Sequence, residues 1–184
     1  METLILNESE ADKAAKIIKS GGVVAIPTET VYGLAASVFD PGAIKKIFLA
    51  KGRPADNPLI VHISNLEDVF KVVSVFNEKA KALAKNFWPG PLTMILPKNE
   101  QIPSIVTAGG NSVAVRFPSH TVARKIIELS GVPLVAPSAN LSGKPSTTRF
   151  SHVLEDLNGK VDADRKSTRL NSSHPTTSRM PSSA

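Results

Sequence analysis

The chain of 184 residues contains no cysteine, so disulfides and thiolate metal sites are excluded and nothing in its composition points to secretion. Aromatic residues make up only 5% of it, so a platform of aromatic rings that stacks nucleic-acid bases is not expected. No run of residues approaches the roughly 18 apolar positions of a membrane-spanning helix. The N-terminus lacks the long apolar core and the cleavage site of a signal peptide. We therefore expect a cytoplasmic protein with no membrane partner.

The composition otherwise indicates a folded and mildly basic protein. Hydrophobic residues make up 41% and charged residues 21% of the chain, which is typical of one globular domain with a real core. The net charge is +6, from 22 basic and 16 acidic residues. Residues 164–184 hold four basic residues and one acidic residue, so they supply +3, and residues 1–163 supply the other +3. This balance suits an anionic ligand but does not by itself require nucleic acid.

Apolar periodicity predicts alternating helices and strands. Helical apolar stripes and capping residues, such as Ser9, predict helices over 9–20, 41–49, 66–75, 77–87 and 121–130. Short β-branched runs between Gly, Pro or polar residues predict strands over 23–26, 59–63, 92–96, 113–115 and 132–136. This alternation favours an α/β sandwich of one domain. In such folds the loops at strand ends collect the ligand-binding groups.

The composition changes after Ala163. The remaining residues are mostly Ser, Thr, Arg, Asn and Pro, with few apolar side chains, so they cannot bury enough surface to fold. We expect residues 164–184 to form a disordered tail. It is either a natural Ser/Thr-rich tail or, in the interpretation that we favour, a non-native segment produced by a frameshift or read-through.

Four polar segments adjoin the predicted strands. The first, PTETVYGL at 27–34, places two hydroxyls and a carboxylate beside Gly33, which can adopt unusual backbone angles. Read alone, it is more simply a capped turn into a helix. The second, KGRPADNPL at 51–59, can aim Lys51 and Arg53 at phosphate or carboxylate. The alternative is a solvated surface loop, but two prolines stiffen this segment, and a solvated loop does not need that rigidity.

The other two segments also border strands. SVAVRFPSH at 112–120 delivers Arg116 to the end of a buried strand, where a guanidinium needs an anionic partner. APSANLSGKPSTT at 136–148 crowds hydroxyls, an amide and a lysine directly after a strand, and its alternative is a flexible Ser/Thr loop. His62, inside the strand predicted over 59–63, is either a satisfied core histidine or a ligand contact.

The sequence lacks the motifs of several other catalytic classes. No Walker loop, GxSxG elbow, HExxH pair or Cys/His cluster occurs in it. Its inventory of cations and short hydrogen-bond donors favours positioning and electrostatic stabilisation, as in nucleotidyl or phosphoryl transfer.

Together these segments resemble the YrdC-like family, the threonylcarbamoyl-AMP synthases, over nearly all of residues 1–163. The matching pieces are PTETVYGL, KGRPADNPL with the family's KxR, WPGPLT at 88–93, SVAVRFPSH, and APSANLSGKPSTT with its SxN. The resemblance implies a twisted mixed sheet with helices on both sides. It also implies a nucleotidyltransferase that makes threonylcarbamoyl-AMP and pyrophosphate from threonine, bicarbonate and ATP, for a downstream tRNA threonylcarbamoyl transferase. ATP would bring Mg²⁺ held by the triphosphate and water, with no metal site on the protein.

The same resemblance implies roles for individual residues. Lys51 and Arg53 would be the catalytic cations near the phosphates. Threonine would be held by Thr30, His62, Arg116 and the backbone of Ala136. ATP would be held by Arg53, Asn57, Ser112, Ser138, Asn140 and Ser146. No covalent enzyme intermediate is expected, since a cleft that holds a carbamate in line with the α-phosphorus supplies the acceleration.

The resemblance ends at the C-terminus. The family normally continues into another strand with an ESTVVD-like motif that contributes to the site, and residues 164–184 do not match it. We therefore expect residues 1–163 to form a domain that is incomplete at its C-terminus, with reduced stability or activity. A rival function is an RNA-binding module for tRNA or double-stranded RNA without catalysis, which the modest +3 of residues 1–163 disfavours. A third reading is an inactive or regulatory fragment.

Overall fold

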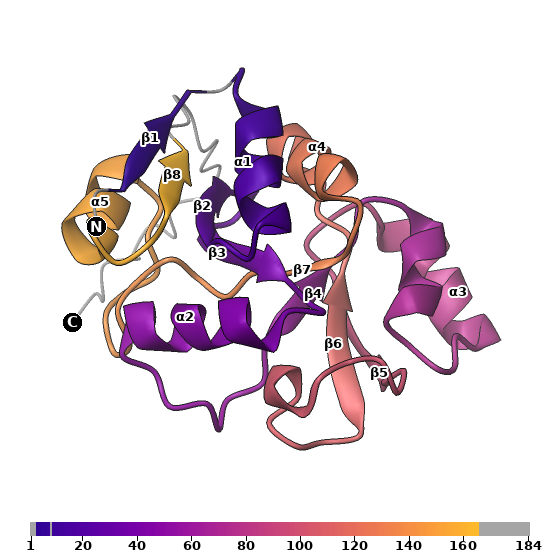
Figure 1. Ribbon diagram of the computed structural model, residues 1–184. Helices are drawn as coiled ribbons and strands as arrows, with labels where there is room; N and C mark the ends of the chain where they lie inside the picture. Colours follow the sequence, from indigo (N-terminus) through magenta and orange to yellow (C-terminus); the bar gives the residue numbers. More distant parts are fainter. Residues whose placement is uncertain (1–2, 8, 166–184) are drawn as a thin grey trace, which may run out of the picture.

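Short apolar runs of the sequence pair into one eight-stranded mixed sheet (Figure 1). The computed structural model describes residues 3–7 and 9–165, and the strands follow the order β1-β8-β2-β3-β7-β4-β6-β5 across the sheet. Their bounds are Leu4–Leu6 (β1), Val24–Pro27 (β2), Tyr32–Ser37 (β3), Ile60–His62 (β4), Thr93–Pro97 (β5), Ser112–Arg116 (β6), Leu134–Val135 (β7) and Ala163–Arg165 (β8). Strands β1, β8 and β2 run parallel, as do β4 and β6, while β3, β7 and β5 are antiparallel to their neighbours.

Two buried clusters cover the two faces of this sheet. The helices are Ala11–Lys19 (α1), Pro41–Lys51 (α2), Glu78–Phe87 (α3), Thr121–Ser130 (α4) and Phe150–Leu157 (α5), with 3-10 turns at Leu66–Lys71 (η1) and Ser104–Val106 (η2). Val24 belongs to the cluster beneath α1 and α4, whereas the next residue, Ala25, belongs to the cluster beneath α2, α3 and α5. Successive strand residues point to opposite faces, so helices cover both sides (Figure 1). The predicted α/β class and the helices on both sides are confirmed.

Local capping residues set the helix ends. The side chains of Asp40, Asn65 and Asn77 accept hydrogen bonds from the first-turn amides of α2, η1 and α3. Helix α2 ends because Gly52 takes a left-handed conformation with φ of 58°, which glycine adopts without steric cost. This turn brings Arg53 to the cavity described below. The predicted Ser9 cap is wrong: Glu10 is the N-cap residue of α1, and the Ser9 hydroxyl bonds Asn7 Oδ1 at 2.6 Å instead.

The sequence pattern missed several elements. Strand β3 forms where a turn into a helix was the simpler expectation, and β1, α5 and β8 were not predicted. The helix expected over 66–75 is only the 3-10 turn η1. Strand β8 includes Asp164 and Arg165 and inserts between β1 and β2, so these two residues of the expected tail form part of the sheet. The rest of the predicted tail lies outside the described residues.

Within the described part of the chain, no helix combines the length and the apolar character that crossing a bilayer requires.

Candidate functional site

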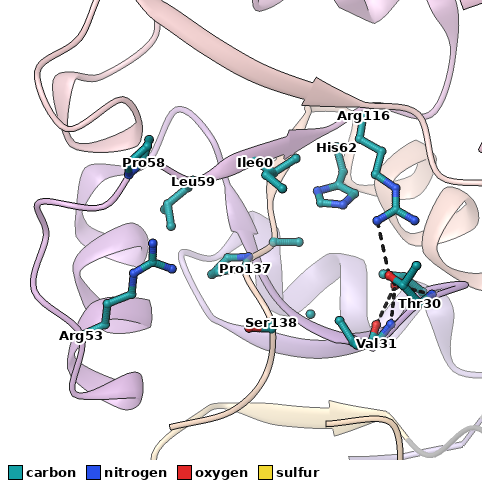
Figure 2. Close-up of a pocket in the computed structure, with 13 residues that line it drawn as sticks. Thr30, Val31, Arg53, Pro58, Leu59, Ile60, His62, Arg116, Pro137 and Ser138 are labelled. Carbon is teal, nitrogen blue, oxygen red and sulfur yellow. Dashed lines mark hydrogen bonds between the residues drawn. The ribbon is translucent and has the colours of Figure 1, made fainter. Parts of the chain in front are cut away.

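A cavity of about 360 Å³ lies where β4 and β6 meet the polar loops (Figure 2). Four segments converge on it: the turn before β3, the loop after α2, the ends of β4 and β6, and the loop after β7. Its lining residues are Thr28, Thr30, Val31, Gly33, Arg53, Pro58, Leu59, Ile60, His62, Arg116, Ala136, Pro137 and Ser138. A volume of this size is at the lower end for small-molecule pockets, so it suits an amino acid or part of a nucleotide.

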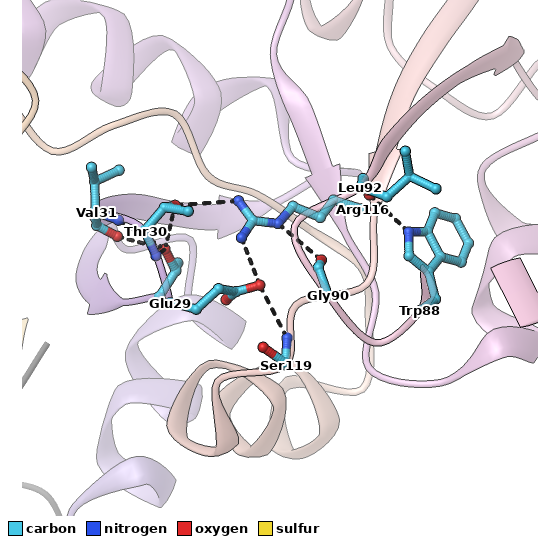
Figure 3. Close-up of polar contacts among 9 residues, drawn as sticks. Glu29, Thr30, Val31, Trp88, Gly90, Leu92, Arg116 and Ser119 are labelled. Carbon is cyan, nitrogen blue, oxygen red and sulfur yellow. Dashed lines mark hydrogen bonds and ion pairs between the residues drawn. The ribbon is translucent and has the colours of Figure 1, made fainter. Parts of the chain in front are cut away.

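Arg116 is the buried cation of this cavity. It is the last residue of β6 and pairs in register with His62 of the parallel strand β4. Its guanidinium forms a 2.6 Å ion pair from Nη2 to Glu29 Oε1, and Nη1 and Nε donate at 3.4 Å to Thr30 Oγ1 and Gly90 O (Figure 3). The side chain is only 10% exposed. The predicted need of this arginine for an anionic partner is met inside the protein by Glu29.

Glu29 is held in its charged form. Burial raises the pKa of its carboxyl, but hydrogen bonds from its own amide and from Arg116, the charge of Arg116 and the Ser119 amide outweigh burial and leave the pKa below its usual value. The pair is therefore ionised at neutral pH, and the guanidinium keeps N–H groups on its terminal nitrogens for an anionic ligand.

His62 is neutral at physiological pH. Burial, and then the charge of Arg116, lower the pKa of its imidazole to about 4. Its Nδ1 atom is buried and makes no well-aligned hydrogen bond among the described residues, although a contact with the Ile60 backbone acts to raise the pKa. Since the residue lines the cavity, its neutral imidazole is suited to a hydrogen bond with a ligand.

The depressed pKa of His62 predicts acid sensitivity of the fold. Below about pH 6.5 the unfolded chain protonates this imidazole and the folded chain does not until about pH 4, so the free energy of unfolding rises with pH across this window. We expect a gain on the order of 2 kcal/mol from pH 5 to pH 7 in urea unfolding. His62→Gln removes that gain, whereas the exposed His152→Gln retains it. An unchanged slope in His62→Gln contradicts this description of the site.

The turn that carries Thr30 is organised by Thr28. The Thr28 hydroxyl donates to Val31 O at 2.6 Å and accepts from the amides of Thr30 and Val31 at 3.3 Å each. This is a Thr-centred turn, and Thr28 is buried within it. It fixes the backbone of Thr30 against the cavity, so Thr28 is a site residue that the sequence analysis did not select. The available signal was the threonine of the PTET segment, because a threonine hydroxyl often bonds the backbone two or three residues further on.

The loop after β7 forms the floor of the cavity because it pairs with β3. Leu34 N donates to Pro137 O at 2.8 Å and Ala139 N donates to Tyr32 O at 2.7 Å. A Cβ atom on Gly33 would come within 3.3 Å of the Cβ of Ala136, so glycine permits this close pairing. The loop after β7 thus continues the pairing of the sheet along β3. This explains why its polar residues come directly after the last residue of β7.

Lys51 is placed differently from the predicted phosphate contact. The side chain is 3% exposed, and its Nζ donates to the carbonyl oxygens of Ser138 and, at 2.7 Å, Asn140. The backbone oxygen of Lys51 accepts from Ser142 N at 2.8 Å. Burial, and then the charge of Arg53, lower the pKa of Lys51 to about 8. This lysine fastens the loop after β7 to the end of α2 and does not line the cavity.

The structure brings six of the predicted site residues together in the cavity: Thr30, Arg53, His62, Arg116, Ala136 and Ser138. Arg53 and Arg116 lie on opposite sides of it (Figure 2). Five others do not line it: Lys51, Asn57, Ser112, Asn140 and Ser146. Asn57 is exposed in the loop after α2, and Ser112 is exposed at the opposite end of β6 from Arg116.

The remaining two predicted residues belong to the loop after β7. Asn140 is buried and its amide nitrogen donates to Leu141 O and Lys144 O at 2.8 Å each, which folds the loop on itself. Ser146 lines a separate shallow depression beside α5. The ligand roles of these residues stay predictions.

The segment WPGPLT supplies a further contact that the sequence analysis did not assign. Trp88 Nε1 donates to Leu92 O at 2.8 Å and Gly90 N donates to Phe117 O at 2.7 Å, so the segment folds tightly beside β6 (Figure 3). Gly90 O then accepts from Arg116 Nε. The WPGPLT motif therefore contacts the Arg116 guanidinium through a backbone carbonyl. The side chains of the motif could not have predicted this contact.

The chemistry available here is anion binding by fixed donors. Among residues 3–7 and 9–165 no group of three or more His, Asp or Glu side chains could hold a metal ion. A buried guanidinium, a second arginine, a neutral imidazole and short hydroxyls surround one cavity. Such preorganised donors stabilise developing negative charge without reorganising during the reaction.

Comparison with known proteins agrees with this description. The Sua5/YciO/YrdC family model, described as telomere recombination, matches residues 16–178. The threonylcarbamoyl-AMP synthase of Pyrococcus abyssi is 52% identical over 166 residues, which cover 87% of this chain and 49% of that protein. The Bacillus subtilis enzyme of the same name is 50% identical over 161 residues, which cover 87% of this chain and 46% of that protein. The crystal structure of P. abyssi Sua5 complexed with L-threonine has a TM-score of 0.86 and 51% identity, over 89% of this chain and 50% of that one.

The fold and the cavity together define an α/β domain with two arginines around a cavity at its strand ends. More narrowly, the chain belongs to the Sua5/YciO/YrdC family. The resemblance noted from the sequence is thereby confirmed. The chain spans about half the length of the curated relatives it matches.

Proposed function

We propose that the chain carries the threonylcarbamoyl-AMP synthase activity for which its relatives are named, as a nucleotidyltransferase. Threonine's amine would combine with bicarbonate to give a carbamate and water. A carbamate oxygen would attack the α-phosphorus of ATP, pyrophosphate would leave, and threonylcarbamoyl-AMP would form. The single observation that supports this most is the buried Arg116, held beside Thr30 and His62 in a cavity of amino-acid size, in a chain half identical to enzymes of that name.

The residues divide the cavity between the two substrates in this proposal. Arg116 would bind the threonine carboxylate through its terminal nitrogens, and Thr30 and the neutral His62 would orient the rest of the amino acid. Arg53, on the side opposite Arg116 in Figure 2, and Ser138, which lies between the two arginines, would face the phosphates of ATP. Mg²⁺ would enter with the triphosphate, held by its oxygens and water.

The product would serve tRNA modification in this proposal. Threonylcarbamoyl-AMP is a mixed anhydride, so a downstream transferase would have to capture it before water does, and tRNA would be the final acceptor. The absence of cysteine from the sequence and the use of ATP suit the cytoplasm. Direct binding of tRNA or double-stranded RNA would be a secondary property.

A pyrophosphate-release assay tests the proposal. With the full chain, Mg²⁺ and ATP, we expect release that requires both L-threonine and bicarbonate, and no release when either is omitted. D-Threonine and L-valine serve as matched substrate controls. Release that is indifferent to threonine would contradict the proposal. So would a folded chain that binds RNA tightly but neither threonine nor ATP, a result that would favour the RNA-binding module instead.

A further inference from the structure

We propose that Glu29 is a positioning residue that aims the Arg116 guanidinium at the cavity and so sets its preference for a carboxylate ligand. The inference rests on the proposed function in one respect, namely that the ligand is threonine. No role was assigned to Glu29 on sequence grounds.

The orientation of Arg116 depends mainly on Glu29. The contact from Arg116 Nη2 to Glu29 Oε1 is 2.6 Å, whereas the contacts from Nη1 and Nε are both 3.4 Å. Protein N–H···O hydrogen bonds usually span about 2.7–3.2 Å, so the two longer contacts restrain the rotation of the guanidinium only weakly. The short ion pair is the dominant restraint.

Glu29 is itself fixed from a second element. Ser119 N, just before α4, donates to Glu29 Oε1 at 3.2 Å (Figure 3). The carboxylate therefore links the turn before β3 to the start of α4, and the same oxygen atom contacts Arg116. A carboxylate fixed by a backbone amide of another element can hold a guanidinium in one orientation.

Glu29 acts from behind the arginine. Arg116 and Thr30 line the cavity, but Glu29 is not among its lining residues. The carboxylate thus supports the cation without touching the space that a ligand would occupy. A residue that works in this way is a positioning residue and makes no direct contact with substrate.

The pair is not a fully satisfied structural ion pair. Glu29 Oε2 and Arg116 Nη2 are buried, and neither has a well-aligned hydrogen-bond partner among the described residues. Buried groups left in this state carry a free-energy cost that structural pairs generally avoid, so they concentrate at functional sites. Because Nη2 faces Glu29, the N–H groups of Nη1, which reach Thr30 at the cavity, are the ones suited to a ligand carboxylate.

The test compares two ligands that differ only in charge. Calorimetric titration of the full chain with L-threonine and L-threoninamide gives the ratio of their dissociation constants. We expect the intact chain to prefer threonine, and Glu29→Gln to reduce that preference at least about tenfold, as the loss of one charge-assisted hydrogen bond implies. Glu100→Gln, an exposed change of the same chemistry, leaves the ratio unchanged.

A double-mutant cycle keeps the test independent of folding losses. If Glu29 acts through Arg116, Glu29→Gln has no further effect on the ratio in an Arg116→Met background. Glu29→Asp keeps the charge, so it should retain part of the preference for threonine over threoninamide. It replaces Glu29→Gln in the test if that variant does not fold. An intact chain that binds no threonine overturns the proposed function. If the intact chain prefers threonine over threoninamide and Glu29→Gln shows an equal or stronger preference, only the role of Glu29 is overturned.

Discussion

Arg116→Met is expected to weaken threonine binding about a hundredfold, which calorimetry can still measure, and to destabilise the fold by about 3 kcal/mol, the lower end of the cost of breaking a buried ion pair. Two effects combine. The ligand carboxylate loses its fork of donors, and Glu29 is left as a charge of low exposure without its 2.6 Å partner. Calorimetry with L-threonine measures the first effect and urea unfolding the second.

Arg149→Met is the matched control, because Arg149 is exposed and its side chain does not cap α5. We expect it to bind threonine as the unaltered chain does. Arg116→Lys is informative as well, since a lysine can restore the charge but not the planar fork. It should recover most of the stability and little of the affinity. Normal threonine affinity in Arg116→Met would remove this residue from the site.

Lys51→Met is expected to destabilise the chain by roughly 2 kcal/mol and to loosen the loop after β7. The methionine fills the same volume but leaves two carbonyl oxygens, those of Ser138 and Asn140, without their buried donor. Each such oxygen costs about 1–3 kcal/mol, partly offset because the burial of a cation is avoided. Urea unfolding measures the loss, with Lys45→Met on the exposed face of α2 as the control.

Hydrogen exchange distinguishes this role from a phosphate contact. If Lys51 fastens the loop, the Ser142 amide, which donates to Lys51 O, should exchange faster in Lys51→Met without any ligand present. Ligand-free exchange and stability equal to those of the unaltered chain, together with a loss of ATP affinity, would return Lys51 to the catalytic role that the sequence resemblance implied.

The elements predicted well were those that local chemistry decides. Helix α2 was predicted over 41–49 from its apolar stripe, and residues 23–26 were predicted as a buried strand from their β-branched side chains, because both patterns act within a few residues. Strand β3 was missed because its sequence, YGLAAS, is small and buried at nearly every position, so no period of two is visible. Its pairing with the loop after β7 stabilises it, and that contact is distant in sequence.

The difference between local and distant contacts also explains which features of the site could be predicted. Arg116 was selected because it ends a predicted strand, where α/β folds gather ligand groups, and parallel pairing places His62, which lies inside a predicted strand, beside it. The contacts of Lys51 were not foreseen because its acceptors lie 87 and 89 residues away, which no local pattern reveals, and its catalytic role stays a prediction. Ser112 shares a motif with Arg116, but four steps of a strand at about 3.3 Å each separate their backbones.

The most direct test of the account is a crystal structure of the chain with L-threonine. It should show the threonine carboxylate within about 2.9 Å of the terminal nitrogens of Arg116, inside the cavity between Thr30 and His62, while Glu29 keeps its contact behind the guanidinium. Threonine bound elsewhere on the chain, with the Arg116 cavity filled only by solvent, would contradict the account.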